Sequence, residues 1–475
     1  MRLFLAALLA ATYYVPPVVA QLSGSVGPTT STASKAAKKI CNIMDYGGVS
    51  SATTDNSAAI TSAWSACKSG GQVYIPAGNY GLSTWVTLSG GTGVSINLEG
   101  IIYRIGTAGG NMFAISTTTD FEFYSANSEG AIQGYGYELN SGGASGPRLI
   151  RLISVTDFSL HDIALVDAPV FHLVLDTCTN GEVYNAIIHG AYEGGLDGID
   201  VWGTNIWFHD IEVSNKDECV TVKNPASNIL VEQIHCNWSG GSAMGSLSTG
   251  IDIHDIEYNY IYTHHSNQMY MFKSNGGSGT VKNILLNNFS GHSNAYTLDL
   301  DSAWSSMSEV DGDGITYTNI TFDNWKGTAT NGVQRGPIKA NCPSAVPCTD
   351  INIENFNVWT DTGSSVLWGC QNAYGSGGCL KSGSGGSYTS TSTVTSVSGY
   401  QYTTMSNELP SGFPVGQQIP IPSIPASFYP GRQPISAVLA KRDEPSPATV
   451  VEAKPSMTAA STITKVIKQT PVSDV

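Results

Sequence analysis

The stretch Phe158-Ser-Leu-His-Asp-Ile163 alternates apolar and polar side chains and ends on a polar residue followed by an apolar one. Similar stretches begin at Val183, Ile206, Ile229, Ile256, Ile284, Ile315 and Ile351. The intervals between successive starts are 25, 23, 23, 27, 28, 31 and 36 residues. A repeat of roughly 20 to 50 residues indicates a solenoid. The period of two within each unit indicates a strand rather than a helix.

These units predict an all-β fold, a single-stranded right-handed parallel β-helix. One short strand in 23 residues leaves room for two further strands and their turns, which together make one coil. The widening intervals indicate loop insertions on the later coils. Asn205, Asn228 and Asn283 lie beside the repeat, where stacked turns need a bent backbone that asparagine tolerates.

The ends of the β-helix carry segments of other kinds. A helix over residues 52–67, with Ala58, Ile60, Ala63 and Trp64 on one face, is expected to cap the open N-terminal end. We place the β-helix domain at 21–382. Residues 383–440 are expected to form a Ser/Thr/Gly linker and a Pro-rich segment extended along the surface. Residues 441–475 lack apolar periodicity and are expected to be disordered.

The first 20 residues have the pattern of a secretory signal peptide. Met1-Arg2 is followed by an apolar run from Leu3 to Ala11, and Val18-Val19-Ala20 gives the small-residue cleavage site. The apolar run is shorter than the roughly 20 residues that span a bilayer. We therefore expect a secreted, extracellular protein that is not held in a membrane.

Cysteines and sequons are consistent with an oxidising, exported environment. The cysteine spacings suggest four local disulfides: Cys41 with Cys67, Cys219 with Cys236, Cys342 with Cys348, and Cys370 with Cys379. The ninth cysteine, Cys178, is expected to be a buried free thiol. Asn237, Asn288 and Asn319 lie in glycosylation sequons.

The net charge of -15 argues against nucleic acid as a partner, because nucleic-acid binding needs a basic face. It does not exclude a polyanionic substrate, since a few local lysines can hold carboxylates.

Counting from the start of each unit brings acidic residues together. Asp197 lies 14 residues after Val183, while Asp217 and Glu218 lie 11 and 12 after Ile206. Similar offsets mean similar positions around the coil, and adjacent coils lie about 4.8 Å apart. Three clustered carboxyl groups raise one pKa, which supplies a protonated acid beside ionised partners, as glycoside cleavage requires.

Lysines follow the acids in a neighbouring column. Lys223 lies 17 residues after Ile206, Lys273 lies 17 after Ile256, and Asp200 lies 17 after Val183. The other interpretation of the acidic cluster is a solvated turn or a calcium site. Gly194, Gly195 and Gly198 favour a binding site, because they let another chain approach.

Three motifs carry a family resemblance over about residues 40–380. Gly195-Leu-Asp-Gly-Ile-Asp200 resembles the Asn-Thr-Asp-Gly motif of polygalacturonase-type pectin hydrolases, glycoside hydrolase family 28. Asn215-Lys-Asp-Glu-Cys219 resembles their Asn-x-Asp-Asp-Cys motif, and Met271-Phe-Lys273 resembles their Arg-x-Lys motif. The resemblance implies the β-helix and an inverting mechanism. We expect no cofactor and no metal. The resemblance also implies that Asp217 is the proton donor, that Asp197 and Glu218 hold and activate water, and that Lys273, with Lys223, binds galacturonate carboxylates.

The departures from the motifs narrow the substrate. Met271 stands where the family has an arginine that grips a carboxylate, which suits a neutral sugar such as rhamnose. The pattern is similar to that of fungal rhamnogalacturonan hydrolases, including the run Cys236-Asn-Trp-Ser-Gly-Gly241. We therefore expect a monomeric hydrolase of the galacturonate–rhamnose backbone of pectin.

The family's Gly-His-Gly motif is replaced by the run Gly240-Gly-Ser-Ala-Met-Gly245. Gly291-His292-Ser293 resembles a displaced copy of that motif, so His292 is a candidate catalytic residue. It starts three coils after the Asp217 coil, roughly 14 Å away, and the alternative is a surface or turn histidine.

Three alternatives stay open. A homogalacturonan or xylogalacturonan hydrolase would share the site, although Met271 argues against homogalacturonan. A calcium-dependent pectate lyase would need an arginine base, and none occurs between Arg151 and Arg335. A non-catalytic carbohydrate-binding solenoid would have an aromatic platform in place of an acid cluster.

Overall fold

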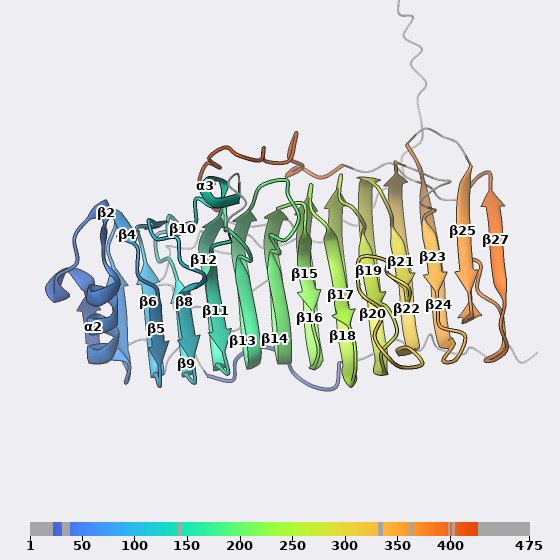
Figure 1. Ribbon diagram of the computed structural model, residues 1–475, viewed down its shortest axis with the longest axis horizontal. Helices are drawn as coiled ribbons and strands as arrows, with labels where there is room; N and C mark the ends of the chain where they lie inside the picture. The colour runs from blue at the N-terminus through green and yellow to red at the C-terminus, as the bar shows by residue number, and fades with distance from the viewer. Residues whose placement is uncertain are drawn as a thin grey trace, which may run out of the picture. The chain divides into compact units, whose positions relative to one another are not determined.

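The computed structural model describes residues 22–30, 39–140, 145–330, 336–361, 365–397, 400 and 404–425. These residues form the predicted right-handed parallel β-helix, in which successive coils stack along one axis (Figure 1). All strand pairs are parallel except the last, in which β27 runs antiparallel to β25. The calls on residues 1–20 and 441–475 lie outside the described residues.

The strands of the N-terminal half are β1 (Lys39–Asn42), β2 (Ser51–Asp55), β3 (Gly71–Ile75), β4 (Asn79–Leu82), β5 (Val86–Ser89), β6 (Thr92–Leu98), β7 (Ile101–Arg104), β8 (Gly110–Ser116), β9 (Thr119–Tyr124), β10 (Ala131–Gln133), β11 (Pro147–Ile153), β12 (Thr156–Val166), β13 (Leu173–His189) and β14 (Ile199–Ser214). The later strands are β15 (Glu218–Val222), β16 (Ala226–Asn237), β17 (Gly241–Leu247), β18 (Ile251–His264), β19 (Tyr270–Ser274), β20 (Gly279–Asn294), β21 (Leu298–Asp301), β22 (Thr316–Ala329), β23 (Ile338–Asn341), β24 (Cys348–Thr360), β25 (Val366–Gln371), β26 (Ala373–Ser376) and β27 (Thr389–Val394). The helices are η1 (Ile43–Tyr46), α2 (Ser57–Cys67) and α3 (Gly136–Asn140).

The repeat forms an isoleucine ladder inside the β-helix. Its members are at most 1% exposed and pair coil to coil in the order Ile206, Ile229, Ile256, Ile284, Ile320 and Ile351. Two predicted starts are out of register. Val183 pairs with Phe208, two residues late, and Ile320 takes the place predicted for Ile315. Because the side-chain period of a strand is two, the slip at Val183 keeps that residue in the core.

Asparagines stack on the turn beside this ladder, as predicted. Asn205 Nδ2 donates to Asn180 Oδ1 at 2.9 Å, and Asn228 Nδ2 donates to Asn205 Oδ1 at 2.8 Å. All three have φ between 53° and 58°, a left-handed conformation that asparagine tolerates. Residues 22–30 run along the outside of this ladder, where the amide of Gly24 donates to Asn228 Oδ1 at 3.2 Å. We call residues 22–30 the N-terminal strap.

Helix α2 caps the N-terminal end, but it begins at Ser57 rather than at residue 52. Residues before it form β2, because β-branched Thr53 and Thr54 favour an extended backbone. Ile60, Ala63 and Trp64 are buried as predicted, whereas Ala58 is exposed and Ala59 takes its place in the core.

The four predicted disulfides are present: Cys41–Cys67, Cys219–Cys236, Cys342–Cys348 and Cys370–Cys379. The first joins α2 to β1, and the second joins β15 to β16 on the coil that carries the predicted acids. Cys178 is free and fully buried, as predicted, and burial raises the pKa of its thiol to about 12.

The stretch predicted as a Ser/Thr/Gly linker contains a strand. Thr389–Val394 forms β27, which pairs antiparallel with β25 at the C-terminal edge of the sheet. An open strand edge presents unpaired backbone groups, and a threonine-rich segment can pair with them without apolar periodicity. Because residues 389–394 have no apolar periodicity, the sequence does not predict this strand.

Part of the Pro-rich stretch is extended along the surface, as predicted. We call residues 404–425 the C-terminal arm. The carbonyl of Phe413 accepts a hydrogen bond from the amide of Tyr192 at 2.7 Å, and Gln133 Nε2 donates to the carbonyl of Ile419 at 2.9 Å. Ile419 is 1% exposed and packs in a small apolar cluster with Ala191 and Leu196.

The C-terminal arm covers one of the predicted glycosylation sites. Asn237 is fully buried, and its Nδ2 donates to the carbonyl of Asn407 at 3.1 Å. This leaves no room for a glycan on Asn237 while the arm is in place. Asn288 and Asn319 are partly exposed.

Candidate active site

Asp217 lies in the turn that leads from β14 into β15. Its Oδ1 accepts a hydrogen bond from the amide of Glu218 at 2.9 Å, and its Oδ2 accepts one from the amide of Gly195. Gly195 has a φ of 82°, a conformation that suits glycine and lets its amide point at the carboxylate. Burial, and then the charge of Asp197, raise the pKa of Asp217.

Three more carboxylates lie together beside Asp217. Oxygens of Asp197, Asp200 and Glu218 all lie within 4.8 Å of one another, and each residue is at most 6% exposed. Asp197 comes from the loop before β14, Asp200 from β14 and Glu218 from β15. Burial, and then the charge of Asp197, raise the pKa of Asp200 to about 7.

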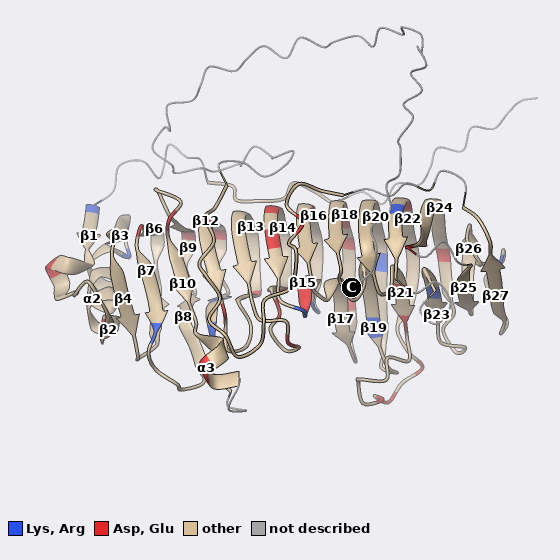
Figure 2. Cartoon of the chain, turned by 90° about the horizontal axis from the view of Figure 1, so that it is seen from above, with Lys and Arg blue, Asp and Glu red and all other residues tan. Residues whose placement is uncertain are grey.

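Two lysines neutralise part of this charge. Lys223 Nζ lies 3.2 Å from Asp200 Oδ1 and 3.7 Å from oxygens of both Asp197 and Glu218. Lys273 Nζ forms an ion pair with Glu218 Oε1. The two lysines stand in one column two coils apart, because Val222 pairs with Met244 and Met244 pairs with Phe272. Figure 2 shows the acidic colour on β15 and the basic colour on β19.

The carboxyl groups of the site differ in the partners that surround them. Asp217 is held by backbone amides, whereas Asp197, Asp200 and Glu218 surround an ammonium group. Carboxyl groups whose environments set their pKa values apart can supply an acid and a base at one pH. The three carboxylates have a spacing that can hold a cation, but the ammonium of Lys223 already supplies a positive charge to all three.

Comparisons with known proteins identify the family. Residues 67–380 match the family described as Glycosyl hydrolases family 28. The chain is 61% identical to rhamnogalacturonase A of Aspergillus aculeatus over 427 residues, which cover 89% of this chain and 97% of the relative.

The chain belongs to glycosyl hydrolases family 28.

Another relative and two solved structures are also similar to this chain. Rhamnogalacturonase A of Emericella nidulans is 57% identical, over 92% of this chain and 88% of the relative. Among solved structures, the endo-xylogalacturonan hydrolase of Aspergillus tubingensis gives a TM-score of 0.63 at 22% identity, over 73% of this chain and all of that chain. The polygalacturonase of Erwinia carotovora gives 0.51 at 17% identity, over 71% of this chain and 98% of that chain. These two structures share the fold. Membership of family 28 argues against the pectate lyase alternative.

The acids named from the family motifs lie together, and the structure adds Asp200 to them. The sequence placed Asp200 at the same offset as Lys223 but gave it no role. Asp200 pairs with Thr221, two residues before Lys223, because the start of its unit is two residues out of register. The long lysine side chain spans that difference. The signal that could have found Asp200 is its position three residues after Asp197, at the end of the same motif.

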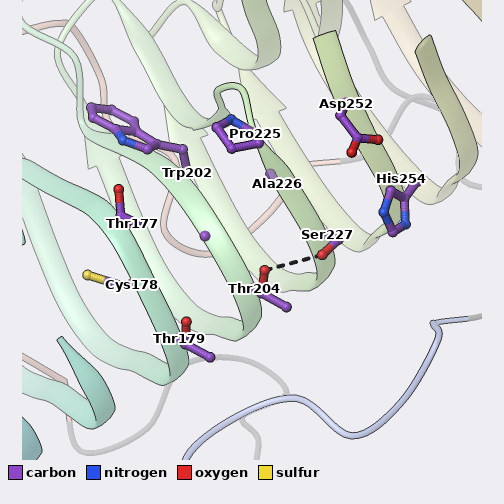
Figure 3. A pocket seen from close by; sticks show the side chains of 11 residues that line it. Thr177, Cys178, Thr179, Trp202, Thr204, Pro225, Ala226, Ser227, Asp252 and His254 are labelled. Atoms are coloured by element: carbon purple, nitrogen blue, oxygen red, sulfur yellow. Dashed lines mark hydrogen bonds between the residues drawn. The ribbon is translucent and has the colours of Figure 1, made fainter. Parts of the chain in front are cut away.

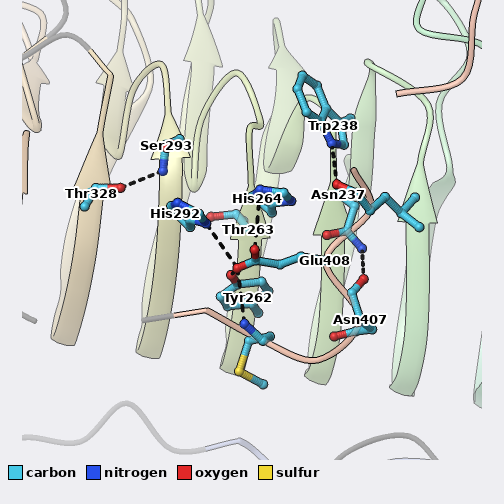
Figure 4. Close-up of polar contacts among 12 residues, drawn as sticks. Asn237, Trp238, Tyr262, Thr263, His264, His292, Ser293, Thr328, Asn407 and Glu408 are labelled. Atoms are coloured by element: carbon cyan, nitrogen blue, oxygen red, sulfur yellow. Dashed lines mark hydrogen bonds and ion pairs between the residues drawn. The ribbon is translucent and has the colours of Figure 1, made fainter. Parts of the chain in front are cut away.

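His292 lies three coils beyond the coil of Asp217, along the strands β14, β16, β18 and β20. There it joins a second polar cluster (Figure 4). Its Nδ1 lies 3.1 Å from Glu408 Oε1 of the C-terminal arm, and its ring stacks on that of His264 with 4.9 Å between centroids. The hydroxyl of Tyr262 donates to the same Glu408 oxygen. These contacts give His292 a place in anchoring the arm.

Met271 occupies the family's arginine position but is 1% exposed. It pairs with Ala243 on one side and Asp299 on the other. It therefore presents little apolar surface to a sugar. With Met271 at the family's arginine position, the side chain there carries no positive charge that could bind a uronate carboxylate.

The described residues contain no helix that is long and apolar enough to cross a membrane.

Proposed function

We propose that the protein is an inverting hydrolase that cleaves the galacturonate–rhamnose backbone of rhamnogalacturonan in pectin. The observation that carries the proposal is the acid cluster, in which backbone amides hold Asp217 while the other three carboxyl groups surround the ammonium of Lys223. The high identity to two rhamnogalacturonases over nearly the whole chain supports this substrate. We also propose that the protein acts outside the cell as a monomer.

Asp217 is proposed as the proton donor to the leaving sugar oxygen. Its raised pKa keeps a proton available at mildly acidic pH, and the amides of Gly195 and Glu218 fix the orientation of the carboxyl group. General acid catalysis of this kind typically contributes a factor of about 100 to 10,000 to the rate.

Asp197 and Glu218 are proposed to hold and deprotonate the attacking water. Asp200, whose pKa is raised to about 7, keeps a proton at mildly acidic pH and is proposed to help position that water. An inverting enzyme needs space for that water, with acid and base roughly 6.5 to 9.5 Å apart. The ammonium of Lys223 offsets part of the negative charge of this cluster, because it lies within 3.7 Å of an oxygen of each of the three residues. Lys273 is proposed to hold a galacturonate carboxylate beside Glu218.

The substrate is tested by incubating the protein with rhamnogalacturonan backbone and, separately, with polygalacturonate. We expect reducing ends to be released faster from rhamnogalacturonan, with the Asp217→Asn variant as the matched control. Equal or faster release from polygalacturonate would overturn the proposed substrate. Release from neither polymer would favour the non-catalytic binding alternative.

A further inference from the structure

A cavity of about 280 Å³ opens on the surface beside the acid cluster (Figure 3). It spans four coils and is lined by Thr179, Trp202, Thr204, Ser227, Asp252 and His254, among others. Trp202 follows Asp200 by two residues, so the cavity borders the proposed active site. On the other side, Asn205 and Asn228 carry the N-terminal strap.

The cavity lies to the side of the acid cluster rather than along the row of coils beyond it. Trp202 stands where β14 bends against β13, at the shift in register between Asp176 and Cys178. A polysaccharide that runs along the stacked coils through the acid cluster therefore passes Trp202. A sugar unit that branches from that polysaccharide on this side would enter the cavity.

The indole of Trp202 is held in a fixed orientation. Its Nε1 donates to Asp176 Oδ1 at 2.7 Å, and Thr177 Oγ1 donates to the same oxygen at 2.8 Å. The other oxygen of Asp176 forms an ion pair with Arg151. This chain of contacts leaves the ring half-buried in the cavity wall, where a fixed aromatic face can bind the apolar face of a sugar.

The remaining polar groups of the cavity suit hydroxyl groups. The hydroxyls of Thr204 and Ser227 lie 3.2 Å apart, and the dashed line in Figure 3 marks this contact. Asp252 is exposed at the rim, and His254 is held by Asp255 at 2.8 Å. The residues that line the cavity include a carboxylate but no lysine or arginine. Such a cavity favours a neutral sugar over a uronate.

We propose that this cavity is an accessory subsite for a neutral sugar unit that branches from the pectic backbone in the active site. The inference rests on the proposed function, since it assumes that a pectic chain lies across the acid cluster. Trp202 supplies the stacking face, and the hydroxyl and carboxylate groups around it supply the hydrogen bonds.

A direct binding test uses methyl galactoside and methyl galacturonide, which differ only in the group at C6. Ligand-observed saturation-transfer NMR is suited to their weak binding. The galactoside signal should be lost in Trp202→Ala and kept in Trp202→Phe, which retains an aromatic face. It should also be kept in Tyr260→Ala, which removes an aromatic ring that is 48% exposed in the wild type. The galacturonide signal should not change in Trp202→Ala. A galactoside signal that survives in Trp202→Ala, or an equal loss of both signals, would overturn the proposal.

A kinetic test compares rhamnogalacturonan that carries neutral side chains with the same polymer after their removal. Trp202→Ala should lower kcat/KM on the branched polymer by about 3- to 10-fold, the usual value of one aromatic stacking contact. On the debranched polymer kcat/KM should stay within about 2-fold of the wild type. An equal loss on both polymers would place Trp202 against the backbone and overturn the side-chain role. If the wild type cleaves neither polymer but Trp202 still governs galactoside binding, the proposed function fails and the subsite stands.

Discussion

Lys223 Nζ lies 3.2 Å from Asp200 Oδ1, in a cluster where burial and the charge of Asp197 raise the pKa of Asp200 to about 7. One ammonium group therefore serves several carboxyl groups that cannot all ionise at low cost. This relationship links the stability of the site to pH and gives the first prediction.

Asp200→Asn should change how stability depends on pH. The folded protein holds a proton on Asp200 that the unfolded chain releases near pH 4. The resulting stabilisation is complete below about pH 4 and is lost as pH rises through about 7. Asn cannot ionise, so the Tm of the variant relative to the wild type should increase between pH 4 and pH 8. Thermal unfolding at several pH values measures this, and a constant or decreasing difference would contradict the raised pKa.

Asp217→Asn should reduce kcat by at least about 100-fold on rhamnogalacturonan, because it removes the proposed proton donor. Asn keeps an acceptor oxygen for only one of the two backbone amides and loses the hydrogen bond to the other, so the Tm should fall by a few degrees while the fold is kept. Near-normal turnover would remove Asp217 from the acid role. A variant that fails to fold would be replaced by Asp217→Glu, which should retain a protonated carboxyl group but misplace it.

Truncation separates the C-terminal arm from the rest of the C-terminus. A chain that ends at residue 440 should keep the Tm and activity of the full chain. A chain that ends at residue 403 should have a lower Tm, because it loses the apolar contacts of Ile419 and the bonds of Asn407 and Glu408. Thermal unfolding of both chains compares them. Equal Tm values would show that the arm contributes nothing to stability.

Glycosylation should follow the exposure of the sequons. After expression in a glycosylating host, peptide mass spectrometry should find glycans on Asn288 or Asn319 and none on Asn237. All three side-chain amides donate a hydrogen bond within the protein, but Asn237 is fully buried under the arm whereas Asn288 and Asn319 are partly exposed. A high occupancy at Asn237 would mean that the arm is displaced in the secreted protein.

Much of this architecture can be predicted because it depends on local sequence patterns. The period-two alternation predicts the strands, and the short cysteine spacings predict the disulfides. The register of single coils was less certain, because a slip of two residues at Val183 still buries an apolar side chain.

Contacts between segments far apart in the sequence could not be predicted. Glu408 contacts His292, which lies 116 residues earlier in the sequence, and no periodicity in the Pro-rich segment predicts that contact. Asp200 was placed near the lysines, but its role depends on burial and on side-chain distances that offsets do not give.

The stereochemistry of cleavage tests the central claim most directly. Proton NMR of the first products from an α-linked galacturonate–rhamnose backbone should show the β-anomer of the new reducing galacturonate before mutarotation. That outcome requires direct attack of water on the anomeric carbon without a covalent intermediate, the step for which we propose the carboxyl cluster beside Asp217. Initial release of the α-anomer would mean retention through a covalent intermediate and would contradict the account.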